Sequence, residues 1–140
     1  MSVPLTKFEE FALNIGSKVF NLATDQIKVA LTNTAPTATD SVYADIISPI
    51  AGTNLSGATP FNVTTTSFLQ TSGTAKLILE DLTLTATGEV GPFQYIVLYS
   101  DTAANDELIG FYDYSSAVTL HENDIYRIDF DAANGCLTIA

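Results

Sequence analysis

The sequence has few of the residues on which disulfide bonding, acid–base catalysis and nucleic-acid binding depend. Among 140 residues there are one cysteine, one histidine, no tryptophan and only five lysines and arginines together. The single cysteine, Cys136, excludes an internal disulfide, so stability has to come from packing or from assembly. Sixteen acidic residues against five basic ones give a formal net charge of −11. That charge disfavours nucleic acid and an anionic membrane as partners.

Long apolar runs are absent as well. No run approaches the roughly 18 residues that a membrane-spanning helix needs, and the N-terminus lacks the basic region and apolar stretch of a secretory signal. We therefore expect a soluble protein. The length fits a single domain, residues 1–140, and a hydrophobic content of 46% is sufficient for a core. Because only 15% of the residues are charged, Thr, Ser, Asn and Gln must cover much of the surface.

No combination of residues in the sequence predicts catalysis. Cys136 alternates with Leu137 in a strand-like tail, and we interpret it as a small packing residue rather than a nucleophile. His121 cannot form a multi-histidine zinc site alone, and we interpret it as a solvent-facing loop residue. Neither of the common glycine-rich phosphate loops is present. We predict a protein that is not an enzyme and has no catalytic residue, cofactor or metal.

Acidic residues gather in three segments, at 101–107, 122–124 and 129–131. Clustered carboxylates are the ligands that calcium prefers, but the stretch DFDAANG lacks the alternating ligand spacing and the distal glutamate of a calcium loop. We interpret these acids as groups that keep loops solvated and discourage pairing between exposed strand edges.

The first twenty residues have helical periodicity. Leu5, Phe8, Ala12, Ile15 and Val19 recur at spacings of three and four, which predicts an amphipathic helix that begins near residues 4–6. We therefore divide the domain into an N-terminal helix or arm, 1–22, and a β body, 23–140. The apolar stripe either packs against the sheet of its own chain or docks on a neighbouring subunit. In the docking case, deletion of residues 1–20 should leave the β body folded.

From Gln26 onward the apolar period changes to two. Ile27, Val29 and Leu31 predict a half-buried strand, and the apolar run 93–99 predicts a central strand packed on both faces. The small apolar group at 42–47 suits a helical turn or a strap across a sheet edge. After a turn at Asn134-Gly135, Leu137 and Ile139 should return beside residues 125–130. Further strands are predicted at 61–66, 76–79, 82–87, 108–114 and 118–120.

About eight or nine short strands with frequent turns predict an all-β fold. We expect a β-sandwich or jelly-roll-like body of about eight strands with one N-terminal amphipathic α-helix. The aromatic residues exceed what one small core needs, so some should lie at interfaces, where tyrosine combines apolar area with a hydroxyl. The interface residues that we predict are Leu5, Phe8, Phe11, Ile15, Val19, Tyr43, Tyr112 and Tyr114.

Three stretches carry a resemblance to a known class of proteins. They are KFEEFALNIGSKVFNL at 7–22, IKVALTNTAPTATDSVYADI at 27–46, and the segment from GPFQYIVLY to CLTI at 91–139. Together they resemble small structural proteins encoded among the virion genes of tailed bacteriophages. The resemblance excludes the middle of the chain, from about 52 to 74, and it rests on strand and turn patterns without a catalytic signature.

The resemblance implies a virion component present in many copies. It favours a capsid decoration or cement protein that is made in the bacterial cytoplasm and sits on the outside of the phage head. Its expected partners are the phage major capsid protein, reached by an N-terminal segment, and other copies of itself in a homotrimer. The alternatives are a tail or baseplate component and an adhesion module that binds host glycans.

Overall fold

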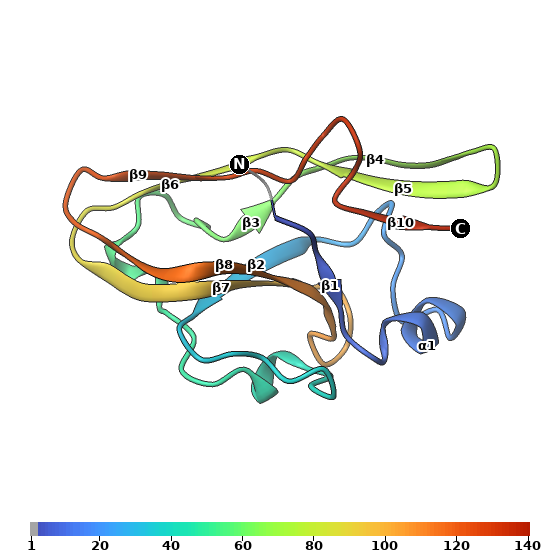
Figure 1. Ribbon diagram of the computed structural model, residues 1–140, viewed down its shortest axis with the longest axis horizontal. Coiled ribbons are helices and arrows are strands. Elements are labelled where there is room, and N and C mark those ends of the chain that lie inside the picture. The colour runs from blue at the N-terminus through green and yellow to red at the C-terminus, as the bar shows by residue number, and fades with distance from the viewer. Residues whose placement is uncertain (1–2) are drawn as a thin grey trace.

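A computed structural model describes residues 3–140, which form two packed layers of β-strands (Figure 1). The first layer is a five-stranded antiparallel sheet. In spatial order its strands are β1 (Thr6–Lys7), β8 (Leu108–Leu120), β7 (Val90–Ser100), β2 (Ile27–Thr32) and β3 (Asn62–Val63). The strands predicted at 93–99 and 108–114 are confirmed as parts of β7 and β8, which pair antiparallel around the 101–107 loop.

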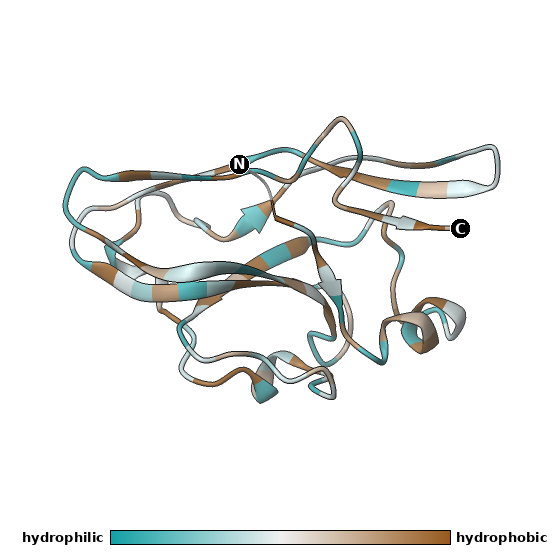
Figure 2. Cartoon of the chain, viewed as in Figure 1, coloured by the Kyte–Doolittle hydropathy of each residue, from teal (hydrophilic) through white to brown (hydrophobic). Residues whose placement is uncertain are grey.

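The second layer contains a three-stranded and a two-stranded sheet. The three-stranded sheet has the order β10 (Leu137–Ile139), β5 (Thr74–Leu79) and β4 (Thr65–Thr71), and the other pairs β6 (Leu82–Thr85) with β9 (Ile125–Ile128). Hydrophobic residues run along strands of both layers (Figure 2). The main core lies between them and includes Ile27, Leu31 and Ile96 of the first layer and Leu77, Leu79 and Ile128 of the second, each at most 1% exposed. The predicted all-β class is confirmed.

The five-stranded sheet is buried on its outer face too. The segment 38–50, which contains the 3-10 turn η1 (Tyr43–Asp45), lies across this face, and a second turn, η2 (Gly52–Asn54), follows. A second apolar cluster forms beneath it from Phe8, Ala30, Ile46, Val97, Tyr99 and Leu108. The predicted double-sided packing of 93–99 is therefore confirmed. The expectation of a half-buried strand at 27–32 is wrong, because the covering segment also buries Ala30 and Thr32.

The N-terminal helix is shorter than its periodicity predicts. The helix α1 spans Phe11–Gly16, and Thr6 and Lys7 instead form β1 against β8. The stripe was misleading because Phe8 packs into the second cluster and Phe11 into the main core, so the two belong to different faces of the sheet. Gly110 allows the close approach of β1, since a Cβ there would lie 2.8 Å from the carbonyl oxygen of Thr6.

The C-terminal strand pairs with a different neighbour from the one expected. β10 lies antiparallel to β5, with Leu137 opposite Leu77, whereas residues 125–128 pair with β6. The turn at 131–135 carries the chain from one sheet to the other, with Gly135 at a φ of +86°. The backbone N–H of Cys136 then donates to the carbonyl oxygen of Leu77 at 2.8 Å. A period of two identifies a strand but not its partner.

Candidate functional site

Cys136 lies in the main core between the two layers. Its Sγ is 3.2 Å from the hydroxyl oxygen of Tyr112 on β8, and its side chain is buried. Burial raises the pKa of the thiol to about 11, while the Tyr112 hydrogen bond opposes that rise. Burial also raises the pKa of Tyr112, as does the neighbouring Cys136. Both groups are therefore protonated at neutral pH, and the pair packs the layers together rather than presenting a thiolate.

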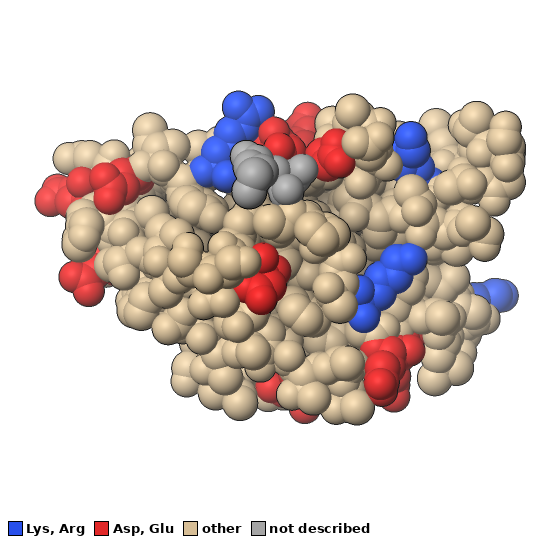
Figure 3. Space-filling view, in the orientation of Figure 1, with Lys and Arg blue, Asp and Glu red and all other residues tan. Residues whose placement is uncertain are grey.

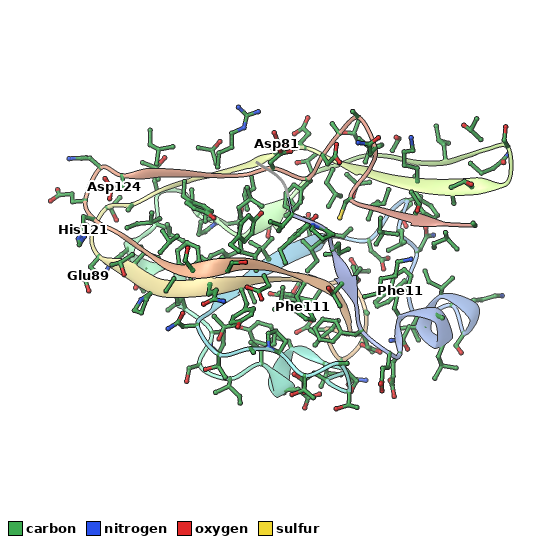
Figure 4. The ribbon with its side chains drawn as sticks, in the orientation of Figure 1. Phe11, Asp81, Glu89, Phe111, His121 and Asp124 are labelled. Atoms are coloured by element: carbon green, nitrogen blue, oxygen red, sulfur yellow. The ribbon has the colours of Figure 1, made fainter. Side chains whose placement is uncertain are left out.

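His121 lies in an exposed turn after β8. Its backbone N–H donates to Oδ2 of Asp124 at 2.8 Å, and within residues 3–140 its ring takes part in no hydrogen bond or salt bridge. Figure 4 places Glu89 and Asp124 at the same end of the molecule. His121 and Asp124 are both exposed, so the position of His121 agrees with a loop residue.

The loop carboxylates act on their own backbone. Glu107 accepts the N–H of Asn105, Asp131 accepts that of Asn134, and Asp45 accepts those of Ser41 and Val42. The Ser41 and Val42 bonds hold the pKa of Asp45 below its usual range. Within residues 3–140 no three histidines, cysteines, aspartates or glutamates gather in a way that could hold a metal ion. These acids stabilise turns in the same way as asparagine and serine do elsewhere.

The predicted interface residues do not form one surface. Phe8, Phe11 and Tyr112 are buried within the chain, each at 4% exposure or less. The others are partly exposed and occupy separate places: Leu5, Ile15 and Val19 beside the main core, Tyr43 against Tyr99, and Tyr114 between Tyr112 and Tyr126. Their role at an interface stays a prediction. Only those that are partly exposed can contact a partner without rearrangement of this fold.

An apolar groove separates α1 from β10. It has a volume of about 310 Å³ and is lined by Lys7, Phe11, Ala12, Ile15, Gly16 and Ile139. Lys7 is the only charged residue of this lining. Its Nζ lies 5.5 Å from the centre of the Phe11 ring and donates to the carbonyl oxygen of Thr138 at 2.8 Å. The two ends of the chain therefore build one surface, and Lys7 connects them.

A second exposed surface is the hairpin formed by β4 and β5. The hairpin extends beyond β10 and α1 at one end of the molecule (Figure 1). Its outer face has a shallow hollow of about 440 Å³ lined by Ser67, Leu69, Thr71, Thr74, Lys76 and Ile78. Leu69 is 71% exposed, more than any other large hydrophobic residue of the described chain. Outside its pairing with β5, the backbone of Ser67–Thr71 makes no hydrogen bond with any other residue of 3–140.

The hairpin also lacks acidic residues. No aspartate or glutamate lies between Asp45 and Glu80, although the chain has sixteen. In the face shown in Figure 3, the end formed by the hairpin carries no red atoms, whereas red atoms are spread over the rest. A search for motifs does not find this surface, because it is distinguished by the absence of acidic residues and not by the presence of a particular residue type. A count of acids along the chain finds it.

Among residues 3–140, no helix is long and apolar enough to cross a membrane. Comparisons with protein-family models, with curated proteins and with solved structures found no match to this chain.

Proposed function

We propose that this chain is a non-enzymatic structural protein of a tailed-phage virion, and specifically a decoration protein that binds the outside of the head and stabilises contacts between capsomers. The resemblance of 7–22, 27–46 and 91–139 to small virion proteins supports the class. A decoration protein must be rigid and must offer apolar area to other proteins. The five-stranded sheet, buried on both faces, supplies the rigidity.

The observation that carries the proposal is the groove between α1 and β10. It is open to solvent and nearly all apolar, and all of its lining except Ile139 comes from the N-terminal segment, which by the resemblance is expected to reach the major capsid protein. A side chain of the shell inserted there would bury apolar area that is now exposed, which favours association. Binding at many equivalent places on a shell multiplies a weak contact through avidity.

The groove can be tested by a pair of substitutions on the same helix. Ala12→Glu puts a charge on the exposed wall of the groove, whereas Leu13→Glu puts the same charge on a residue that is 62% exposed and does not line it. The assay is co-sedimentation with heads from the encoding phage that were prepared without this protein. We expect Ala12→Glu to weaken binding at least tenfold and Leu13→Glu to bind as the natural chain does. Equal binding by the two variants would place the contact elsewhere.

The location in the particle is tested by electron microscopy of the encoding phage with gold-labelled antibodies against this chain. Label on the outside of heads supports the decoration role. Label confined to tails or baseplates contradicts it and supports the tail alternative. A glycan-binding role predicts that host glycans raise the melting temperature, because a ligand that binds only the native state stabilises it.

A further inference from the structure

Most strand edges of this fold are unsuited to pairing with another chain. The outermost strands of the five-stranded sheet, β1 and β3, have two residues each, and beyond β1 the edge of β8 carries the charged Asp113 and an irregular backbone at Ser115, whose φ is +66°. β10 has three residues, and Lys7 already occupies the carbonyl oxygen of Thr138. β6 is engaged at one end, where Thr85 accepts the N–H of Ser56, and β9 carries the exposed Arg127. Short strands and charged edge residues are known means of preventing edge-to-edge association.

The edge of β4 has neither protection. The strand spans seven residues, TTSFLQT, with no charge and no proline, and it is rich in β-branched and aromatic residues. A register shift between Thr65 and Ser67 leaves Ser67–Thr71 as its regular part. Leu69 lies at the centre of this part and is 71% exposed. The backbone groups of an uncovered edge strand are a template for an added strand.

We propose that two copies of the chain associate by antiparallel pairing of their β4 strands, centred on Leu69, so that the two three-stranded sheets become one continuous sheet. In this register Leu69 faces Leu69 of the other copy, Ser67 faces Thr71, and Phe68 faces Gln70. No charged residue meets another across the pair. The most exposed large apolar residue of the described chain then contacts its counterpart in the other copy.

The charge distribution favours a second copy at this edge. With a formal charge of −11, two copies repel each other over most of their surfaces. The hairpin lies within the longest stretch of the sequence without acids, between Asp45 and Glu80, and its only charged residue is Lys76 on β5. An approach through β4 therefore keeps the acidic loops of the two copies apart. β4 itself carries no charge, so it offers neither an acidic nor a basic partner protein a complementary charge.

Pairing of like edges closes after two copies, because the interface is the same patch on both. A ring of three needs β4 to pair with a different edge, and the alternatives are short, already engaged, or carry a charged residue such as Asp113 or Arg127. This inference goes beyond the proposed function and does not depend on it. If the chain does bind a shell, a symmetric pair presents two α1–β10 grooves and gains avidity.

The test is a charge swap at the symmetry axis. Leu69→Lys and Leu69→Glu each put like charges directly opposite in the self-pair, whereas an equimolar mixture of the two variants puts lysine opposite glutamate. We expect the natural chain to show a concentration-dependent dimer by sedimentation velocity. Each variant alone should dimerise at least tenfold more weakly, and the mixture should recover the dimer. Melting temperatures measured at a concentration where the natural chain is monomeric should be the same for all chains, which shows that the variants fold.

The matched control uses Ile47, which is 60% exposed and lies far from β4 in sequence. Ile47→Lys and Ile47→Glu change the net charge in the same way, and they should dimerise as the natural chain does, alone or mixed. A monomer at every concentration, a trimer, or a dimer indifferent to the Leu69 variants would overturn the inference. None of these results changes the shell-binding comparison of Ala12→Glu with Leu13→Glu, so the two proposals fail separately.

Discussion

The five-stranded and three-stranded sheets of this protein differ in how much of each is covered. The first is packed on both faces, and its outermost strands have two residues each. The second is packed on one face and ends in the seven-residue strand β4, whose outer edge is open. The difference suggests a division of roles. Burial makes the first sheet rigid, while the second sheet, which has one open face and no acidic residue, and the groove beside it offer contact area.

Deletion of residues 1–20 should have the largest effect, because it removes cover from the five-stranded sheet. Phe8, Phe11 and Phe20 are 3%, 4% and 6% exposed. Loss of one buried phenylalanine side chain costs about 3–5 kcal/mol, and a domain has only about 5–15 kcal/mol in total. We expect the truncated chain to lose its cooperative thermal transition in circular dichroism. The sequence alone led to the opposite expectation, that the β body stays folded without residues 1–20. A sharp thermal transition in the truncated chain would support that earlier expectation.

The same substitution in each layer sharpens the comparison. Phe93 on β7 is 1% exposed and meets Tyr126 edge-on at 5.4 Å, whereas Phe68 on β4 is only partly buried. We expect Phe93→Ala to lower the free energy of unfolding by about 3–5 kcal/mol and Phe68→Ala by about 1 kcal/mol. Urea denaturation of both variants measures the difference. Equal losses would mean that the hairpin is as well packed as the central strand.

Local patterns predicted the first layer better than the ends of the chain. The run 93–99 predicted a doubly buried strand because a strand packed on both faces is apolar at nearly every position rather than at alternate ones. The N-terminal stripe failed because Phe8 and Phe11 have helical spacing but pack on opposite faces of a sheet. The partner of β10 was not predictable, because alternation carries no information about which strand lies alongside.

The candidate surfaces were only partly predictable. Leu5, Phe8, Phe11 and Ile15 pointed to the N-terminal segment, and the groove beside α1 does include Phe11 and Ile15. The other wall of the groove contains Ile139 of β10, and the predicted neighbour of that strand was wrong. The groove could therefore not be predicted from the sequence. Leu69 and the open edge of β4 fell in the segment that the resemblance excludes, and only the fold shows that nothing in 3–140 covers them.

The contact between the layers gives a pH-dependent prediction of intermediate size. The pKa of Cys136 is raised from 9.0 to about 11 by burial, so above pH 9 the unfolded chain loses a proton that the folded chain keeps. Stability from this group is complete below pH 9 and falls as the pH rises toward 11. We expect a loss of about 1 kcal/mol by pH 10.

The control for this effect is Cys136→Ala. Tyrosines ionise in the unfolded chain at higher pH and affect the natural chain and the variant alike, so the difference between the two isolates the thiol. Urea midpoints between pH 8 and pH 10 should fall more steeply for the natural chain. Parallel pH profiles would show that the thiol is not buried against Tyr112 as described.

Lys7 gives the smallest expected effect and tests why β10 and β4 differ as edges. Lys7→Met keeps an unbranched side chain beside Phe11 but removes the donor to the Thr138 carbonyl oxygen. We expect a global loss of about 0.5 kcal/mol, the lower end of the range for a single hydrogen bond, because the bond from Lys7 is exposed to solvent. Hydrogen exchange should quicken at the amides of 137–139, while those of β7 stay protected. Exchange that quickens equally in β10 and β7 would mean that Lys7 supports the whole fold. The hydrogen bond from Lys7 would then not be what distinguishes the edge of β10 from that of β4.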